Sequence, residues 1–499
     1  MSSWGRRTAE RVCGIGGAAA VGLSGKCRWR VAVLALALLV GNGAVDGGDL
    51  SHGASNSSSL AAAVSPPNIL IIVTDDQRSG LSAMPATRRI FKRDGIRYPD
   101  AYVTDPLCCP SRASIMTGRY SHNTGVRSNI ERPELGVSAG SALDASSTIQ
   151  RYLDDAGYTT ALFGKYLNKW DFSKAPPYFD SFALVNRQRG YYRNRVSVGT
   201  ASAGVTNIFV SEMYNATIVR ERTLGFLRSQ AKSQQPFFLY VAPGAPHNPF
   251  TPEPKYADDT FGAWAGNPAV GEANKSDKPR YVQAASARLM DGRRIRTRQY
   301  RTLESVDRMI DAIYAELRAQ RKDKNTLAFF ISDNGSMWGE HGLLGKNVPY
   351  TSSVQVPFFM RWPSGPLTSG TSDPRGAANI DIAPTVLQAA GIPIPSTTDG
   401  HSLLGDWHRE RRLTEHWCNI TKCLFWAAER TREYHYIEYY DGPNFDTANV
   451  TFREYYDLIA DPYELRNLLR DGDPANDPDV TTPAALLAAD RNCAGDACP

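Results

Sequence analysis

The sequence predicts an α/β fold: a large domain with a mixed, mostly parallel sheet between helices, then a smaller α+β domain with an antiparallel sheet. Two observations support this fold class. Up to residue 405, short continuous apolar runs alternate with segments of helical period, and such runs suit strands buried on both faces. After residue 405 the chain becomes aromatic, more alternating and rich in turn signals, which favours antiparallel strands.

Five apolar runs are the predicted strands of the large domain. They are 68–74 (NILIIVT), 158–164 (YTTALFG), 236–242 (PFFLYVA), 326–332 (TLAFFIS) and 356–362 (VPFFMRW). Residues 301–320 form the clearest predicted helix, because Leu303, Val306 and Ile310 recur at helical spacing. Strands that alternate with helices along a chain indicate a parallel sheet with helices on both faces.

The N-terminal 45 residues carry most of the formal charge. The chain has 499 residues and a net charge of +5, and residues 1–45 hold six basic residues against one acidic residue. The remainder is about neutral, so overall charge gives no support for a nucleic-acid partner. A basic stretch precedes the apolar run VAVLALALLVG, so we expect residues 1–45 to be a signal peptide or, if uncleaved, a membrane anchor. Residues 46–66, rich in Gly, Ser and Ala, read as a linker.

Sequons and cysteines both indicate the secretory pathway, with the cell wall, the medium or a lysosome-like compartment as destinations. The predicted glycosylation sites are Asn56, Asn215, Asn274, Asn419 and Asn449. Cys418 and Cys423 could close a short disulfide loop, and so could Cys493 and Cys498. That leaves the neighbouring cysteines 108 and 109 without obvious partners.

Polar side chains follow four of the predicted strands. Asp75 and Asp76 come after 68–74. The others are Lys165, His247, Asp333 and Asn334, which follow the strands at 158–164, 236–242 and 326–332. Because ligands bind beyond the carboxyl ends of the strands in open α/β sheets, we expect these side chains at one rim.

The two acid-rich pairs predict a cation site. Adjacent carboxylates repel each other unless a cation lies between them. Asp75, Asp76, Asp333 and Asn334 offer only oxygen ligands, which suit Ca²⁺ or Mg²⁺ rather than Zn²⁺. Either pair alone would more often just open a loop, but two pairs after matched strands favour the metal interpretation.

Residues 106–120 (PLCCPSRASIMTGRY) predict a helix with a reactive start. Pro110 fits a first helical turn, and the helix can continue to Gly118. Cys108 would then lie just ahead of the helix N-terminus, where free N–H groups and the macrodipole favour anions. The same position is expected to lower the pKa of its thiol.

Three cations complete the predicted pocket. Arg112 lies one turn along the helix, and Lys165 and Lys346 supply two further positive charges. Together with a metal and a helix N-terminus, they predict a site for a compact oxyanion such as sulfate or phosphate. His122 is interpreted as structural or as a substrate contact, and His341 is left between the same two roles.

Several motifs resemble those of the formylglycine-dependent type I sulfatases. CCPSRASIMTGR resembles the signature C-x-P-S-R followed by T-G-R/K, and TDDQ, GKYLN, APHNP, SDNG and GLLGK resemble other active-site blocks in the same order. DGHSL and YYDLIADPYELRNLL resemble the late signatures, so the resemblance covers roughly residues 67–469. The wording of GKYLN and APP is most similar to the branch with N-acetylglucosamine-6-sulfatases, extracellular endosulfatases and algal arylsulfatases.

The resemblance implies an alkaline-phosphatase-like catalytic domain at 67–405 and a smaller domain at 406–499. It also implies that Cys108 is oxidised to Cα-formylglycine by a formylglycine-generating enzyme. The residues that match the Ca²⁺ ligands are Asp75, Asp76, modified Cys108, Asp333 and Asn334.

The resemblance further implies a covalent mechanism. The hydrated aldehyde attacks sulfur, with Asp333 matching the activating residue, and its second hydroxyl later expels sulfate. The metal stabilises charge together with Arg112, Lys165 and Lys346, and His247 matches the general acid. The implied substrate is a sulfated carbohydrate, such as N-acetylglucosamine 6-sulfate in a glycosaminoglycan or algal polysaccharide, or an aryl sulfate.

One departure and two alternative functions stay open. Leu167 stands where many sulfatases have histidine, so His122, Asn168 or water are candidates for the elimination base, and Asn168 and His341 are candidate substrate contacts. The alternatives are a phosphonate or phosphate diesterase with the same formylglycine, and a catalytically silent glycan-binding protein. The arginine-rich tract 293–301 is interpreted as a solvated loop before a helix or, less favoured, as a grip on an acidic polysaccharide.

Overall fold

The structure is a computed structural model that describes residues 65–186, 190–418 and 423–499. The predicted signal peptide or anchor, nearly all of the linker, and the sequons at Asn56 and Asn419 lie outside the described residues. Among the described residues, no helix combines the length and the apolar character that crossing a membrane requires.

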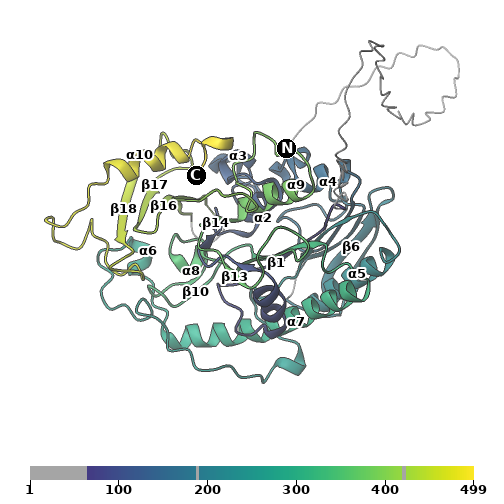
Figure 1. Ribbon diagram of the computed structural model, residues 1–499. Coiled ribbons are helices and arrows are strands. Elements are labelled where there is room, and N and C mark those ends of the chain that lie inside the picture. The colour runs from purple at the N-terminus through teal and green to yellow at the C-terminus, as the bar shows by residue number, and fades with distance from the viewer. Residues whose placement is uncertain (1–64, 187–189, 419–422) are drawn as a thin grey trace, which may run out of the picture. The chain divides into compact units, whose positions relative to one another are not determined.

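A ten-stranded mixed sheet forms the centre of the large domain (Figure 1). Its strands in spatial order are β13 (Thr371–Ser372), β2 (Ile96–Arg97), β12 (Phe358–Arg361), β9 (Thr326–Ser332), β1 (Asn68–Thr74), β8 (Phe237–Ala242), β4 (Thr159–Gly164), β5 (Ser181–Asn186), β6 (Asn194–Thr200) and β7 (Gly204–Ser211). From β9 to β5 the strands run parallel, whereas β12 pairs with β9 in the antiparallel sense. All five predicted strands are therefore confirmed, and so is the mixed, mostly parallel sheet.

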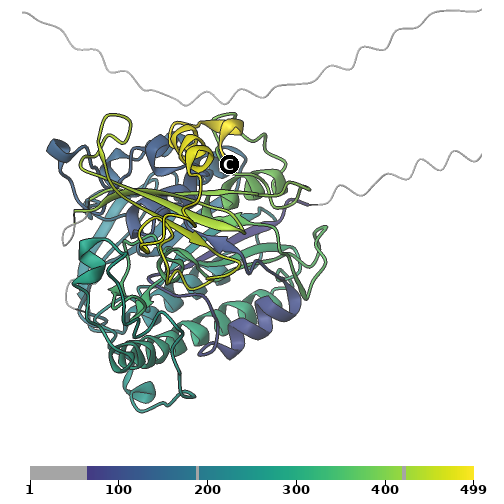
Figure 2. The same ribbon diagram turned by 90° about the vertical axis from the view of Figure 1, so that its left-hand side faces the viewer.

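Helices cover both faces of this sheet because successive residues of its strands point to opposite sides (Figures 1 and 2). Along β1, Ile69 and Ile71 belong to one apolar cluster, and Leu70 and Ile72 to the other. The first face packs against α2 (Cys108–Thr117), α4 (Ile149–Asp155) and α9 (Ile382–Ala389), and the second against α5 (Asn215–Ser229) and α7 (Leu289–Ala319). Each fully buried aliphatic side chain contributes about 1.5–3 kcal/mol, so the two clusters hold the three layers together.

Helix α7 begins twelve residues before the predicted start, so the arginine-rich tract 293–301 lies within a helix and not in a solvated loop. Three of its arginines fasten the preceding segment to the helix. Arg293, Arg296 and Arg301 donate hydrogen bonds to the carbonyl oxygens of Trp264, Gly262 and Asp259, at 2.8, 3.0 and 2.8 Å. The prediction of a solvated loop was wrong because these arginine side chains donate to backbone carbonyl oxygens of residues 259–264. The sequence of the tract alone does not show these contacts.

The C-terminal region forms a separate four-stranded antiparallel sheet, as predicted. Its strands are β15 (Arg412–His416), β16 (Phe425–Arg430), β17 (Tyr434–Tyr440) and β18 (Val450–Asp457), and α10 (Thr481–Asp490) adds Leu487 to its core. Residues 64–499 form one compact unit, and the predicted boundary at residue 405 stays a prediction. Cys418 is paired with Cys423, and Cys493 with Cys498.

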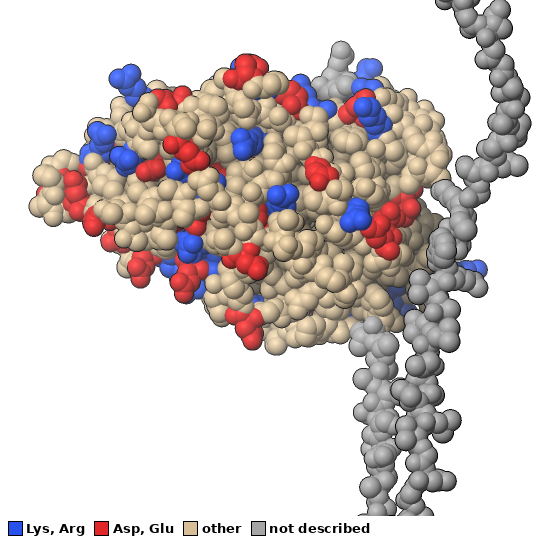
Figure 3. Space-filling view, turned by 90° about the horizontal axis from the view of Figure 1, so that it is seen from above, with Lys and Arg blue, Asp and Glu red and all other residues tan. Residues whose placement is uncertain are grey.

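Short elements complete the fold around the main sheet. β3 (Ala101–Tyr102) pairs with β14 (Ala377–Ala378), and β10 (Met337–Trp338) pairs with β11 (Leu344–Gly345). The short helices are α1 (Pro85–Thr87), α3 (Ser121–Thr124), α6 (Arg280–Gln283) and α8 (Thr351–Val354). On the face shown in Figure 3, basic and acidic side chains are intermingled, in keeping with the near-neutral composition of this part of the chain.

The structure contradicts one predicted glycosylation site. The side chain of Asn215, at the start of α5, is only 2% exposed. Its amide nitrogen donates to Asn194 Oδ1 at 3.1 Å, and its Oδ1 accepts the N–H of Gly244 at 2.7 Å. A glycan needs a free, accessible amide nitrogen, so this prediction was wrong. Asn274 and Asn449 are exposed and stay predictions.

Gly164 tests the close contact between β4 and β8. It has φ of +116°, and an added Cβ would lie 2.0 Å from the carbonyl oxygen of Ala242. Gly164→Ala should lower the free energy of unfolding by roughly 3 kcal/mol in chemical denaturation, because backbone strain and a backbone clash add. Gly157→Ala is the control, since its φ is +84° but no atom lies within 4 Å of the added Cβ. Equal losses for the two variants would contradict the packing argument.

Candidate functional site

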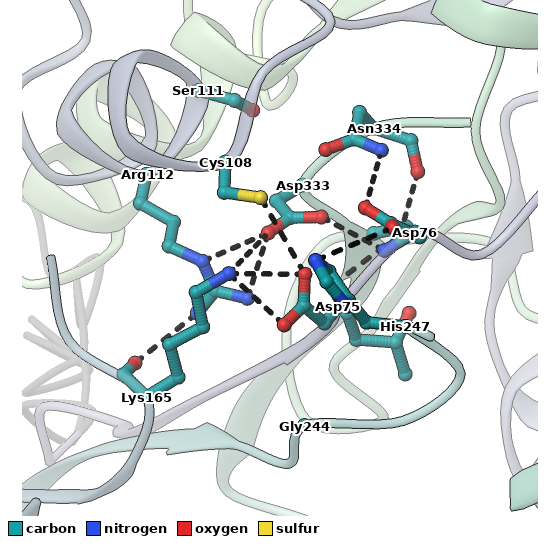
Figure 4. A network of polar contacts seen from close by, with 12 residues as sticks. Asp75, Asp76, Cys108, Ser111, Arg112, Lys165, Gly244, His247, Asp333 and Asn334 are labelled. Atoms are coloured by element: carbon teal, nitrogen blue, oxygen red, sulfur yellow. Dashed lines mark hydrogen bonds and ion pairs between the residues drawn. The ribbon is translucent and has the colours of Figure 1, made fainter. Parts of the chain in front are cut away.

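The carboxyl ends of the central parallel strands bring the predicted polar side chains together (Figure 4). Asp75 follows β1 and Asp333 follows β9, and the N–H of Asp333 donates to the carbonyl oxygen of Thr74 at 3.1 Å. This bond carries the β1–β9 ladder one step beyond the strands, so the two aspartates leave the sheet side by side. The N–H of Asp76 then donates to Asp333 Oδ1 at 3.0 Å.

Asp76 is held in a backbone conformation that few residues adopt. Its φ is 71°, in the left-handed region, and Asn334 Nδ2 donates to its Oδ1 at 2.8 Å. Burial would raise the pKa of its carboxyl, but the nearby Lys346 and His247 lower it below the ordinary value. Asp76 is therefore an ionised carboxylate in a partly enclosed site.

Lys346 reaches three of the predicted site residues from the loop after β11. Its Nζ donates to Asp76 Oδ1, to Asn334 Oδ1 at 3.2 Å and to Cys108 Sγ at 2.7 Å. Burial opposes its charge, but Asp76 and the other acids raise its pKa well above the usual range. The ammonium group thus lies where oxygen atoms of Asp76 and Asn334 and the sulfur of Cys108 come together.

Arg112 ties helix α2 to the end of β9. Its Nε and Nη2 lie 2.9 and 2.8 Å from Asp333 Oδ2, and its Nη1 donates to the carbonyl oxygen of Lys165 at 3.1 Å. The side chains of Arg112 and Asp333 are completely buried. Burial would lower the pKa of Arg112, but Asp333 raises it, so the guanidinium stays charged. The pair fixes the position of α2 relative to the sheet.

Lys165 enters the site from the end of β4. Its Nζ lies 3.0 and 2.9 Å from the two carboxylate oxygens of Asp75 and 3.9 Å from Asp333 Oδ2. The N–H of Lys165 donates to the carbonyl oxygen of Ala242, which anchors its backbone to the end of β8. This geometry agrees with the predicted position of Lys165 at the rim beside the aspartates.

Cys108 is the first residue of α2, not a residue ahead of it, and it is 1% exposed. Its Sγ lies 3.6 Å from Asp75 Oδ1. Burial raises the pKa of the thiol, and this effect outweighs the opposite influence of Lys165 and Lys346. The predicted lowering of the pKa by the helix N-terminus was therefore wrong. An unmodified Cys108 is poorly suited to act as a thiolate.

His247 lies at the edge of the cluster in the loop after β8. About a quarter of its side chain is exposed, at 26%. Its Nδ1 lies 2.9 Å from the carbonyl oxygen of Asn248, so in the neutral ring Nδ1 carries the proton. Its Nε2 faces Asp76 Oδ2 at 3.8 Å. Nε2, which carries no proton in this neutral form of the ring, therefore points into the site.

Two of the predicted contact histidines lie outside the cluster. The Nδ1 atom of His122 lies 2.8 Å from Glu415 Oε2, and its Nε2 lies 3.0 Å from the carbonyl oxygen of Cys493. These contacts occupy both ring nitrogens of His122, and its candidate role as the base for elimination stays a prediction. His341 is 1% exposed and its Nδ1 lies 2.7 Å from Glu272 Oε2, so the structure does not bring it to the cluster either.

Asn168 lies beside helix α2 and contacts it through its backbone carbonyl oxygen. Its carbonyl oxygen accepts the N–H of Gly140 at 3.2 Å and lies 3.8 Å from Cys109 Sγ. Its side-chain Oδ1 is buried without a hydrogen-bond partner among the described residues. The geometry therefore places Asn168 near the start of α2, and its predicted substrate contact stays a prediction.

Two residues that support the site were not foreseen. Asn129 Oδ1 accepts the N–H of Cys109 at 2.8 Å, at the start of α2. Gln299 Nε2 donates to the carbonyl oxygen of Asp76 at 3.4 Å, and its Oε1 accepts the indole N–H of Trp338 at 2.7 Å. Gln299 lies four residues before Leu303 on the apolar face of α7, and a polar residue at such a position is the sequence signal that could have revealed it.

The cluster brings several possible metal-ligand atoms close together. One ligand atom from each of Asp75, Asp76, Cys108 and His247 lies within 4.8 Å of the others. The ammonium group of Lys346 already contacts oxygens of Asp76 and Asn334, so these oxygens are arranged to receive positive charge. The cluster can therefore hold a metal ion.

The family of the chain follows from its match to known sequences. A family profile described as Sulfatase matches residues 67–392, which is more than half of the chain. The chain belongs to the sulfatase family. A second profile, described as N-sulphoglucosamine sulphohydrolase, C-terminal, matches residues 339–478. The resemblance seen in the sequence motifs is thereby confirmed.

Individual relatives agree with this assignment. The chain is 36% identical over 356 residues to an extracellular sulfatase Sulf-1 homologue of Caenorhabditis elegans, covering 68% of this chain but only about half (48%) of that protein. It is 28% identical over 469 residues to the human N-acetylglucosamine-6-sulfatase, covering 83% of each. These names match the branch of the family that the motif wording indicated.

A solved structure supports the fold. A protein described as being in complex with its substrate D-glucosamine-2-N,6-O-disulfate superposes with a TM-score of 0.68 at 21% identity, covering 85% of this chain and 96% of that one. At this identity the likeness shows the fold alone, and it confirms the alkaline-phosphatase-like class.

The buried pair Arg112–Asp333 should be among the costliest contacts to break. Arg112→Met leaves Asp333 buried without its partner, so we expect a loss of about 3–5 kcal/mol in the free energy of unfolding by chemical denaturation. The control is Arg89→Met, which breaks an ion pair to Asp311 in which both side chains are 49% exposed. That change should cost less than about 1 kcal/mol. A loss at Arg112 no larger than at Arg89 would contradict the assigned role.

Proposed function

We propose that the chain is a sulfuric ester hydrolase that acts on sulfate esters of a carbohydrate or an aryl alcohol. The observation that carries this proposal is the joint position of Cys108, two lysines and an arginine around three carboxylates, in a chain of the sulfatase family. Three cationic side chains in a cluster that can also hold a metal leave an excess of positive charge for an anionic ester.

We propose that Cys108 is converted to Cα-formylglycine by a formylglycine-generating enzyme of the secretory pathway. Burial and the raised pKa of the thiol support this, because an unmodified thiol here would be a weak nucleophile. The hydrated aldehyde supplies a nucleophilic hydroxyl and a second hydroxyl from which the aldehyde can be restored. The names of extracellular and N-acetylglucosamine-6-sulfatase relatives support export of this chain.

The metal of the proposed enzyme is Ca²⁺, held by Asp75, Asp76, Asp333, Asn334 and modified Cys108. Oxygen donors from carboxylates and an amide are the ligands that Ca²⁺ prefers. When bound, the ion would add positive charge beside the sulfate group. The chain's own cations act on the same group: Lys165 and Lys346 can each donate hydrogen bonds to sulfate oxygens.

The remaining roles follow from orientation. Arg112 holds Oδ2 of Asp333 while the N–H of Asp76 holds Oδ1, so the carboxylate of Asp333 cannot rotate. His247 turns its Nε2 towards the site, so when that nitrogen is protonated it can deliver the proton to the leaving alcohol oxygen.

Modification of Cys108 is tested by mass spectrometry of the peptide that contains it, from protein made in a eukaryotic host. We expect a residue lighter than cysteine that reacts with hydroxylamine as an aldehyde. Cys108→Ala should lower kcat for release of inorganic sulfate by at least about 10⁴-fold, because the nucleophile is removed. Cys109→Ala is the matched control, with a buried cysteine changed one position along the helix. An intact thiol in protein that still hydrolyses sulfate esters would refute the formylglycine assignment.

The role of His247 predicts a dependence on the leaving group. His247→Gln should lower kcat on a sulfated sugar by about 10²–10⁴-fold, because a sugar alkoxide needs a proton as it leaves. The loss should be much smaller on p-nitrophenyl sulfate, whose phenolate leaves without protonation. Steady-state kinetics on both esters makes the comparison, and an equal loss on the two would argue against proton donation.

A further inference from the structure

A cavity of about 440 Å³ is lined by residues of α3 and of the segment that follows α10. Figure 1 shows these two elements near the C-terminus of the chain. Its walls come from both halves of the molecule. Asn123 and Arg127 contribute from the segment after the active-site helix, and Trp417, Phe445 and Arg491 from the C-terminal region. None of the proposed catalytic residues lines it, so it is a separate feature.

One wall of the cavity is joined through the backbone to a residue that contacts the start of α2. Arg127 lies two residues before Asn129, whose Oδ1 accepts the N–H of Cys109 at 2.8 Å. Two residues of chain span at most about 7 Å. One wall of the cavity therefore begins within a short distance of the residue that follows Cys108.

Each acidic side chain in the cavity lies beside its own partner. Glu415 contacts His122 at 2.8 Å, and although burial opposes the charge of this histidine, Glu415 raises its pKa above the ordinary value. Asp446 lies 4.0 Å from Arg491 Nη2 and accepts from Asn492 Nδ2 at 3.0 Å. Both carboxylates thus have local partners.

Arg127 lines the same cavity but belongs to neither of these two pairs. Its guanidinium lies over the ring of Trp417, 4.9 Å from the centroid, which restricts its orientation. Within the part of the chain that the structure describes, Arg127 forms no ion pair, and its Nε is buried without a hydrogen-bond partner. A planar guanidinium held on an aromatic ring in a concave site is pre-organised to bind an oxyanion through two N–H groups.

We propose that this cavity is a second anion subsite. It would take a sulfate or carboxylate group of the same saccharide chain whose sulfate ester lies at Cys108. The inference rests on the proposed function and narrows it: the preferred substrate is a polyanionic oligosaccharide and not a singly sulfated sugar. The competing interpretation is that Arg127 serves only to pack against Trp417.

Binding to a catalytically inert chain separates these two interpretations. In a full-length Cys108→Ala background with Ca²⁺, calorimetry measures the Kd for a heparin hexasaccharide. Adding Arg127→Gln should weaken binding about tenfold, since a charged hydrogen-bond donor is lost. Arg132→Gln is the matched control, because Arg132 is an exposed arginine of the same loop that does not line the cavity, and it should leave the Kd unchanged.

Two further oligosaccharides identify the group that is bound. A carrageenan hexasaccharide carries sulfates only, and an alginate hexasaccharide carries carboxylates only. A loss on Arg127→Gln with the first alone assigns the subsite to sulfate, and with the second alone to carboxylate. Arg127→Lys keeps the charge but loses the planar fork, so its Kd should fall between those of the parent and Arg127→Gln, and its thermal unfolding checks the packing on Trp417.

Equal Kd values for Arg127→Gln and Arg132→Gln with all three oligosaccharides would overturn the subsite. So would a parent chain that binds none of them. The proposed function fails separately, if the chain with Cys108 intact releases no sulfate from any ester. If Arg127→Gln weakens binding but the chain with Cys108 intact shows no turnover, the result supports the anion subsite and refutes the proposed enzymatic function.

Discussion

The buried contact between Arg112 and Asp333 is the interaction on which the site depends. Two elements far apart in the sequence, helix α2 and strand β9, meet in it without any solvent exposure. The same carboxylate accepts the N–H of Asp76, while the N–H of Asp333 continues the ladder to β1. Asp333 thereby sets the position of the helix that begins with Cys108 and of the loop that carries the proposed metal ligands Asp75 and Asp76. Removing a partner from such a pair costs more than the pair itself contributes.

Charge balance explains the chemistry that the site can support. The carboxylates of Asp75, Asp76 and Asp333 are matched by Lys165, Lys346 and Arg112, so a bound divalent cation would make the pocket electropositive. An anionic ester restores the balance, and a thiolate at Cys108 would compete for the same positive charge. Burial raises the pKa of that thiol, which agrees with a cysteine that is a precursor and not the nucleophile itself.

The sequence predicted the centre of the fold better than its edges. Runs 68–74 and 326–332 coincide with β1 and β9, because a strand buried on both faces is apolar at every position. Strand β7 has mostly exposed or half-buried residues at the sheet edge, so it leaves no such run. The early start of α7 and the burial of Asn215 depend on tertiary partners, Trp264 and Asn194 among them, which no local pattern encodes. The strand-end residues were foreseen because topology alone brings them together, whereas Asn129 and Gln299 act through contacts from other elements.

The most direct test of the central claim is ion chromatography of inorganic sulfate and phosphate released by the full chain made in a eukaryotic host with Ca²⁺. The substrates are matched sulfate and phosphate esters of the same sugar and the same phenol. Hydrolysis of sulfate esters with a kcat/KM well above that for the phosphate esters is the predicted result. Preferred hydrolysis of phosphate esters, or no release of sulfate from any ester by protein that carries the formylglycine, would contradict it.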